Sequence, residues 1–343
     1  MKKERVFYLD FIRGISVIFI VVFHYNIALS THLISGNEIL FTNYKNGSLG
    51  QIGVSLFFII SGAALMYTYE KNFSIKEYIK KRFISIYPMF WIAYTITFLY
   101  LFYINRMINR DIPKNRILLT LIGFDGYSLY KVPNFYLLGE WFLGCIILCY
   151  IFFPILRRLL LDKPKTLILC VVVFHIIFVK YYNFTMQIDR NIFNQLPSFI
   201  FGMFFIKYLK KINIYEFTIC MITCILMFTI SIPINGMYKV TIMGVSSFGV
   251  LVYISQYLDI HIFKYIFYVI GKYSYAIFLV HHVTIDRLMT RFNSSAITRF
   301  ESYCLFIIIV SIIIFFSLVL YYLNNIILRK YKHSIVKILS GNV

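Results

Sequence analysis

The sequence predicts an all-α polytopic membrane protein with about ten transmembrane helices. Of its 343 residues, 60% are hydrophobic and only 14% are charged, against roughly 25% charged residues in an ordinary soluble domain. Apolar stretches of about 20 residues recur along the chain, which is the length a helix needs to cross a bilayer. These stretches do not alternate between polar and apolar residues, as barrel strands do. A soluble fold and a disordered chain are excluded by the same composition.

Ten expected spans follow one another along a single membrane domain, residues 1–343, and we expect no appended soluble domain. The first span contains Asp10 and Arg13 and lacks a small-x-small cleavage site, so it is interpreted as a retained helix and not a signal peptide. The third is expected to begin at Tyr87 and Pro88, because proline is tolerated at a helix start. By hydropathy the spans cover residues 7–29, 48–69, 87–105, 135–156, 166–183, 192–209, 215–233, 239–258, 262–284 and 302–328.

The longest connection runs from about residue 106 to 134 and contains an apolar fragment, Ile117 to Phe124, that is too short to cross. We expect this fragment to dip into the outer surface as a lid. With the N-terminus inside, the inner segments hold 20 Lys and Arg residues and the outer segments hold 12. This asymmetry predicts that both termini are cytoplasmic.

The basic balance and the cysteines exclude two other classes of function. The net charge is +20, but the basic residues lie beside apolar spans, as membrane orientation requires, so we expect no nucleic-acid partner. The six cysteines lie inside apolar stretches without a C-x-x-C pair or a histidine at zinc spacing. We therefore expect no metal site.

One face of the first span carries three ionisable side chains, and such groups are costly inside a bilayer. Asp10, Arg13 and His24 fall within about 60° around the helix axis. Arg13 and His24 are roughly 16 Å apart along that axis, so they cannot form a hydrogen bond. Asp10 and Arg13 are three positions apart and can pair. The alternatives are that this pair only anchors the helix end and that His24 is structural.

Further candidates lie at the ends of other spans. His281 and His282 end the ninth span and Glu140 with Trp141 starts the fourth, all on the expected outer side, where they are also ordinary interfacial residues. In GVSLFFIISG, small residues such as Ser61 allow close approach of a helix or a ligand tail, and helix packing is the simpler reason. A basic inner loop before the third span could bind phosphates, although topology alone predicts much of its charge; it contains Lys80, Lys81 and Arg82.

These motifs occur in a fixed order: LDFIRG with His24 eleven residues after Arg13, then GVSLFFIISG, KRFISIYPMFW, EWFLGCIILCYIFFP and YSYAIFLVHH. Together they resemble the acyltransferase-3 family of integral membrane acyltransferases, over about residues 6 to 330. The resemblance implies transfer of an acetyl or other short acyl group from cytosolic acyl-CoA to a hydroxyl of a surface glycan or its lipid-linked precursor. It implies an enzyme of the stand-alone surface-glycan O-acetyltransferase type, in the plasma membrane.

The resemblance also implies roles for residues. His24 matches the catalytic histidine, Arg13 its partner arginine and Asp10 the acidic residue before it. Arg82 matches the first arginine of a basic pair for the donor, with Lys80, Lys81 and Tyr87 nearby, but Ser85 stands at the second arginine position. His281, Glu140, Trp141 and Ser61 are candidates for holding the acceptor or supporting the site. Acetyl-CoA or another acyl-CoA is expected as co-substrate, with no bound cofactor; the expected partners are acyl-CoA, the glycan and membrane lipid.

A different class of function shares many of these features. A transporter or flippase for a lipid-linked saccharide would also have about ten helices, outer-rim aromatic residues and buried charge. The chain lacks paired Gly/Pro-broken spans in matching halves, and its polar groups are concentrated in one helix. Acyl transfer is therefore the preferred prediction, ahead of transport or polysaccharide polymerisation.

Overall fold

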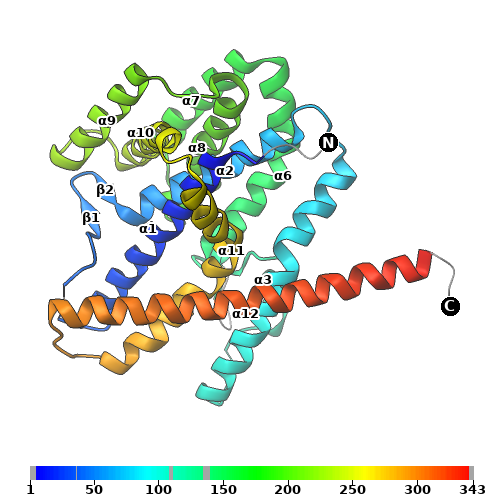
Figure 1. Ribbon diagram of the computed structural model, residues 1–343, viewed down its shortest axis with the longest axis vertical. Helices are drawn as coiled ribbons and strands as arrows, with labels where there is room; N and C mark the ends of the chain where they lie inside the picture. Colours follow the sequence, from blue (N-terminus) through cyan, green and yellow to red (C-terminus); the bar gives the residue numbers. More distant parts are fainter. Residues whose placement is uncertain (1–4, 36, 108–110, 134–139, 340–343) are drawn as a thin grey trace.

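A computed structural model describes residues 5–35, 37–107, 111–133 and 140–339. The described chain is mostly helical, with loops between the helices and one short hairpin, β1 (Asn43–Tyr44) and β2 (Gly47–Ser48). Its longer helices are arranged around α1, α2 and α8 (Figure 1). They are α1 (Phe7–Thr31), α2 (Leu49–Tyr69), α3 (Ile75–Asn105), α6 (Trp141–Asp162), α7 (Pro164–Lys180), α8 (Ile192–Phe204) continued by the π-helix η3 (Phe205–Leu209), α9 (Ile214–Thr229), α10 (Gly236–Tyr257), α11 (His261–Met289) and α12 (Arg299–Leu339).

The predicted fold class, an all-α polytopic membrane protein, is confirmed. Within the described ranges, eight helices are long and apolar enough to cross a membrane, and α9 is a shorter apolar helix. Each of the ten expected ranges contains one of the helices above. Residues 135–139 of the fourth range lie outside the described residues. The ends differ most at α3, which begins twelve residues before the expected residue 87, at Ile75.

The expectation that Pro88 stands at a helix start is wrong, because Pro88 lies inside α3. Lys80, Lys81 and Arg82 are consequently helical and do not belong to a loop. A proline in a helix interior forfeits one backbone hydrogen bond. The charged first turns of α3 lower the local hydropathy. A hydropathy window that selects apolar spans therefore places the start of this helix too late in the sequence.

The centre of the bundle depends on a close contact between α2 and α8. A Cβ atom on Gly202 would lie 1.8 Å from the carbonyl oxygen of Ile59, and one on Gly62 would lie 2.0 Å from that of Phe199. Only glycine permits this approach of two backbones, as small residues do at helix contacts in membranes. Beside it, the Ser55 and Ser198 hydroxyls are 2.9 Å apart. The glycines of GVSLFFIISG thus serve helix packing.

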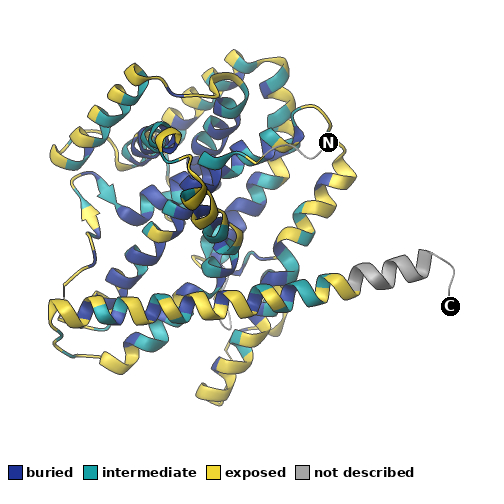
Figure 2. Cartoon of the chain, in the orientation of Figure 1, coloured by how far each residue is buried: buried dark blue, intermediate teal, exposed yellow. Residues whose placement is uncertain are grey.

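The peripheral helices present apolar side chains outward. Figure 2 shows α9 as a mixture of exposed and intermediate residues, much of α12 as exposed and the central helices as largely buried. Exposed residues of α12 include Ile307, Phe315 and Tyr322, each more than half accessible. Such surfaces are stable when lipid covers them.

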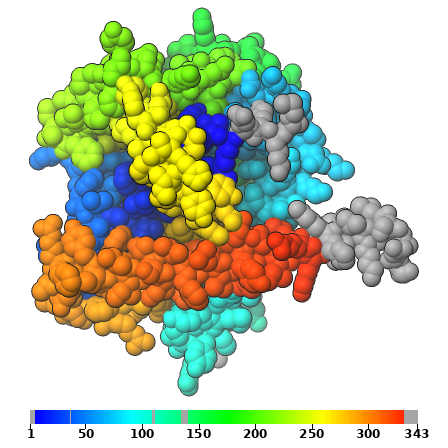
Figure 3. Space-filling view, in the orientation of Figure 1, coloured from blue at the N-terminus to red at the C-terminus, as the bar shows by residue number. Residues whose placement is uncertain are grey.

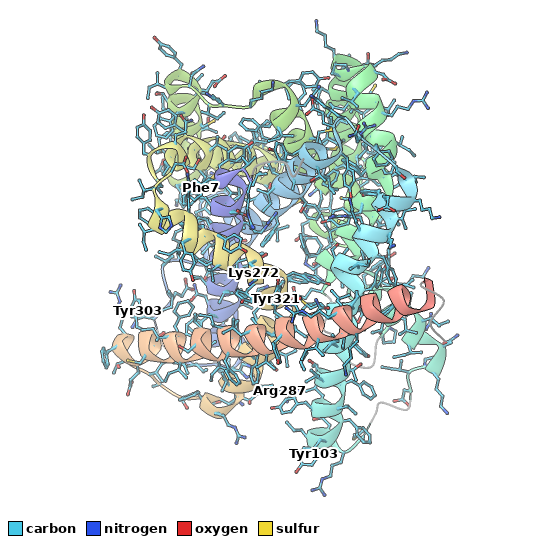
Figure 4. All side chains as sticks on the ribbon, turned by 45° about the vertical axis from the view of Figure 1, so that its right-hand side comes forward. Phe7, Tyr103, Lys272, Arg287, Tyr303 and Tyr321 are labelled. Carbon is cyan, nitrogen blue, oxygen red and sulfur yellow. The ribbon has the colours of Figure 1, made fainter. Side chains whose placement is uncertain are left out.

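Helix α12 crosses one face of the molecule as a continuous ridge (Figure 3) and contacts α11 and α3. Lys272 of α11 lies beside Tyr321 of α12 (Figure 4), with its ammonium 5.0 Å from the ring centroids of both Tyr273 and Tyr321. These rings reduce the cost of a cation at an apolar surface. The Tyr25 hydroxyl of α1 donates to the carbonyl of Ser302 at 2.8 Å, which ties α12 to the first helix.

The long connection between α3 and α6 packs against the bundle. It contains the 3-10 helix η1 (Lys114–Arg116), α4 (Ile117–Leu121) and α5 (Asp125–Ser128). Trp91 donates its indole N–H to the carbonyl of Leu121 at 2.9 Å, and the Tyr87 hydroxyl donates to that of Ile122 at 3.1 Å. The fragment expected to act as a lid is thus held along α3, and the following α5 forms a wall of the cavity described below.

Candidate active site

Three ionisable side chains meet from three separate elements: His24 on α1, Glu140 at the N-cap of α6 and His281 on α11. The Nε2 atom of His24 is 3.8 Å from one Glu140 carboxylate oxygen, and the Nε2 atom of His281 is 3.8 Å from the other. The two imidazole rings are edge-to-face with centroids 5.0 Å apart. We call these three residues the His–Glu–His cluster. The structure therefore brings together three residues that the sequence singled out individually.

The imidazole of His281 is completely buried, and its orientation is fixed by the backbone. Its Nδ1 atom is 2.7 Å from the carbonyl oxygen of Phe278, so Nδ1–H donates and the Nε2 atom faces Glu140. Among the described residues, neither that Nε2 atom nor the nearer Glu140 oxygen has a hydrogen-bond partner. Buried polar atoms without a partner are uncommon and call for a functional explanation.

Glu140 is held by backbone contacts on both sides. A parallel β-bridge joins it to Gly126 of α5, and its carbonyl accepts the N–H of Leu143 at 2.9 Å. On the opposite side, α1 and α11 are joined near their ends, where the His32 ring and the Asp286 carboxylate are 3.0 Å apart. These contacts set the relative positions of the three cluster residues.

A cavity of about 420 Å³ opens beside the cluster, and His24, Glu140 and the exposed His282 line it. Its wall contains apolar and aromatic surface, including the predicted residue Trp141. It also contains five polar side chains that were not identified from the sequence: Ser48, Gln51, Asp189, Arg190 and Gln195. The volume and the mixture of aromatic surface with a few polar groups are typical of a small-molecule site.

The polar wall residues come from two regions. Gln51 belongs to the capping box of α2, in which the Ser48 hydroxyl accepts the backbone N–H of Gln51 at 3.3 Å. Asp189 and Arg190 lie on the 3-10 helix η2 (Ile188–Arg190), and the Gln195 amide donates to the Asp189 carbonyl. The Arg190 side chain is half-buried and forms no ion pair with a described residue. It is therefore available to a ligand in the cavity.

The opposite end of α1 holds a separate charged cluster. Arg5 donates two hydrogen bonds to the Asp10 carboxylate, one of them at 2.9 Å, and Arg13 lies 3.6 Å from it. The predicted Asp10–Arg13 pair is present, but Arg5, which the sequence analysis counted only as a topological charge, is the closer partner. Glycine at position 271 of α11 makes room, because a Cβ there would lie 3.3 Å from Asp10.

The residues predicted to bind the donor do not all face one cavity. Arg82 and Tyr87 line a groove of about 360 Å³ between α3 and α6, and the Arg82 guanidinium lies 5.6 Å from the Tyr150 ring centroid. Lys80 and Lys81 are exposed and lie outside the groove lining.

Two further polar residues are separate from the cluster. Ser61 lies on α2 and does not line the larger cavity. His175 on α7 is buried with its Nε2 atom 3.1 Å from the Asn194 side-chain oxygen, which indicates a structural role.

Comparison with known proteins provides one match. Residues 6–322 match the family model described as an acyltransferase domain, of the acyltransferase-3 family. Neither the curated proteins nor the solved structures compared with the chain give a match. The match spans most of the chain, including the complete His–Glu–His cluster. The protein is thus a multi-pass membrane acyltransferase, and the chain belongs to the acyltransferase-3 family.

Proposed function

We propose that the protein transfers an acetyl or other short acyl group from cytosolic acyl-CoA to a hydroxyl of a cell-surface polysaccharide or its lipid-linked precursor. The observation that carries this proposal is the His–Glu–His cluster beside a cavity large enough for a sugar. Family membership supports acyl transfer. The cavity's aromatic surface and hydrogen-bonding side chains fit a polyhydroxylated acceptor.

His24 acts as the general base in this proposal. Its Nε2 atom takes the proton of the acceptor hydroxyl as the hydroxyl oxygen attacks the thioester carbonyl. The resulting tetrahedral intermediate collapses, the carbon–sulfur bond breaks, and the imidazolium of His24 returns the proton to the CoA thiolate. The products are an acyl ester and free CoA, so atoms and charge balance.

Glu140 is a positioning and electrostatic residue in this scheme. Its carboxylate lies 3.8 Å from His24, where it stabilises the imidazolium that forms as the hydroxyl loses its proton. His281 lies on the other side of the same carboxylate and limits its movement. A general base typically contributes about 10² to 10⁴ to a reaction rate, so loss of His24 should nearly abolish transfer.

The donor approaches from the opposite side of the membrane. Acyl-CoA carries several phosphates and cannot enter lipid, so its charged end should contact basic residues at the cytoplasmic surface while the thioester extends toward His24. Arg82 with Lys80 and Lys81 supplies one basic surface. Arg13, held with Arg5 around Asp10, supplies a second cationic group nearer the bundle axis. Arg13 orients the donor and takes no part in proton transfer, since it is about 16 Å from His24 along the helix.

The proposed location is the plasma membrane with both termini cytoplasmic. The excess of Lys and Arg on one set of connections supports this orientation. It places the cavity on the outer side, where a surface glycan is accessible. Cysteine substitutions at Lys71 and Lys239 test it: in intact cells, a membrane-impermeant thiol reagent should label position 239 and leave position 71 unlabelled.

The function is tested on the host's surface glycan by mass spectrometry and proton NMR. Deletion, complemented, His24→Ala and His175→Ala strains are compared for base-labile acyl esters at matched protein levels. Deletion and His24→Ala should lose the ester while glycan chain length persists. His175→Ala replaces a buried histidine outside the cluster and should retain the ester. A glycan that is missing from the deletion strain would favour transport, and a shortened glycan would favour polymerisation.

A further inference from the structure

We propose that the His–Glu–His cluster binds Zn²⁺ or a similar divalent transition-metal ion, and that this binding reversibly blocks acyl transfer. The blocking effect rests on the proposed function of His24, whereas the ion site rests on geometry alone. The sequence predicts no metal site, because the ligands of the proposed site come from α1, the start of α6 and α11 and therefore share no spacing along the chain.

The donor set and its dimensions suit such an ion. Two imidazole nitrogens with one carboxylate oxygen form a donor set that zinc commonly takes in proteins. The three ligand atoms lie within 4.8 Å of one another. A tetrahedral zinc ion with bonds of about 2.0 to 2.1 Å requires its ligands about 3.4 Å apart. The two 3.8 Å separations involve different oxygens of Glu140, so ligand atoms that lie within 4.8 Å of one another must move together by up to about 1.4 Å to reach this spacing.

Part of the site is already organised for coordination. The Phe278 carbonyl accepts the Nδ1–H of His281, which leaves the Nε2 lone pair directed at Glu140. A hydrogen bond of this kind on the far ring nitrogen is the usual support for a metal-binding histidine. The Nε2 atom of His281 and the adjacent Glu140 oxygen are buried and lack a hydrogen-bond partner among the described residues. A cation between them would satisfy both atoms.

The cavity supplies the remaining coordination position. His24 and Glu140 both line it, so a water molecule can complete a four-coordinate ion. The other cavity histidine, His282, has its ring centroid 5.1 Å from that of His24, but it is not among the three residues whose ligand atoms converge. His282 is therefore a matched control: it is a neighbouring histidine on the same cavity wall outside the predicted ligand set.

Blocking follows from the chemistry of the imidazole nitrogen. The Nε2 lone pair of His24 can bind a metal ion or accept a proton, but it cannot do both. An occupied site removes the general base and places a cation where the imidazolium would form. Transfer should fall in proportion to occupancy and return when a chelator removes the ion.

Binding is measured on full-length protein in detergent that has been stripped with a chelator. Zn²⁺ is titrated in competition with a chromophoric chelator. Wild type and His282→Ala should bind about one equivalent with equal affinity, whereas Glu140→Gln and His24→Gln should each weaken binding about tenfold or more. His24→Gln removes one imidazole ligand and leaves the fully buried His281 side chain in place. Equal affinity in wild type and both cluster variants, or an equal loss in His282→Ala, overturns the proposed site.

Blocking is measured separately in membranes supplied with labelled acetyl-CoA. Zn²⁺ should lower base-labile labelling of the glycan, excess EDTA should restore it, and Mg²⁺ at the same concentration should have little effect. Stimulation by Zn²⁺, or loss of transfer after chelation alone, overturns the blocking role. If untreated membranes show no transfer at all, the proposed function fails while the binding titration still decides the ion site.

Discussion

Glu140 provides the sharpest test of the proposed mechanism, because its carboxylate lies between the two cluster imidazoles and its side chain is only 15% exposed. Replacing it by glutamine preserves the shape and one acceptor oxygen but removes the negative charge. Unit charges about 4 Å apart interact by about 4 kcal/mol at an effective dielectric constant of 20. The His24 imidazolium would form 3.8 Å from this carboxylate. Since about 1.4 kcal/mol is a factor of ten in rate, Glu140→Gln should lower kcat by about 10² to 10³.

The assay is the initial rate of base-labile labelling of glycan in membranes supplied with labelled acetyl-CoA, with protein levels matched by immunoblot. Glu301→Gln is the control, because Glu301 is an exposed carboxylate at the start of α12 whose hydrogen bonds to described residues are local, to Thr298. Its rate should equal that of wild type. Glu140→Asp retains the charge and should recover part of the rate, and it should shift the pH profile less than Glu140→Gln does. A Glu140→Gln rate within threefold of wild type would refute the electrostatic role.

Three further predictions concern packing, pH and the acceptor. Gly202→Leu should destabilise the protein by about 3 kcal/mol or more, since even a Cβ there would lie 1.8 Å from the Ile59 carbonyl oxygen. The midpoint of thermal unfolding in detergent should therefore fall. An unchanged midpoint would contradict the close contact. Burial raises the pKa of Asp125 from 3.8 to about 7, so the folded protein keeps a proton that the unfolded chain releases. Stability should therefore fall by about 2 to 3 kcal/mol as pH rises from about 5 to 8, and Asp125→Asn should remove that part of the pH dependence of the unfolding midpoint. Arg190→Gln should raise the acceptor KM about tenfold with little change in kcat, as measured with glycan purified from the deletion strain; a fall in kcat alone would place Arg190 outside acceptor binding.

The sequence predicted the fold class because a bilayer requires long apolar helices, and that requirement is visible in hydropathy. It missed the start of α3 because Lys80, Lys81 and Arg82 continue the helix beyond the apolar segment. Hydropathy reports the solvent around a segment, whereas a helix is maintained by its backbone hydrogen bonds. Hydropathy therefore predicts the apolar part of α3, whereas the charged start of α3 is determined by helical hydrogen bonding that hydropathy does not report.

The candidate site was predicted as separate residues and not as an arrangement. His24, Glu140 and His281 were each selected as ionisable groups at the expected outer ends of spans, but contacts between helices cannot be read from spacing within one helix. Arg5 was missed because a basic residue before the first span is already explained by topology. Gln51, near the start of the second expected span, and Arg190, between two spans, gave no signal beyond being ordinary polar residues, and only the folded chain places them on one cavity wall.

Amino-acid substitutions are tolerated less well at the glycine contact between α2 and α8 than at the cavity wall. Where two backbones touch, almost any substitution alters the distance between helices and thereby moves every group that those helices carry. The part of the cavity wall formed by η2 has less restriction, since Asp189 and Arg190 are only half-buried and line the cavity. A change of acceptor can therefore arise by exchanging residues of that wall while the reacting groups keep their positions. If the acceptor is a glycan, as proposed, engineering of new acceptor specificities should begin at η2 and leave the α2–α8 contact unchanged.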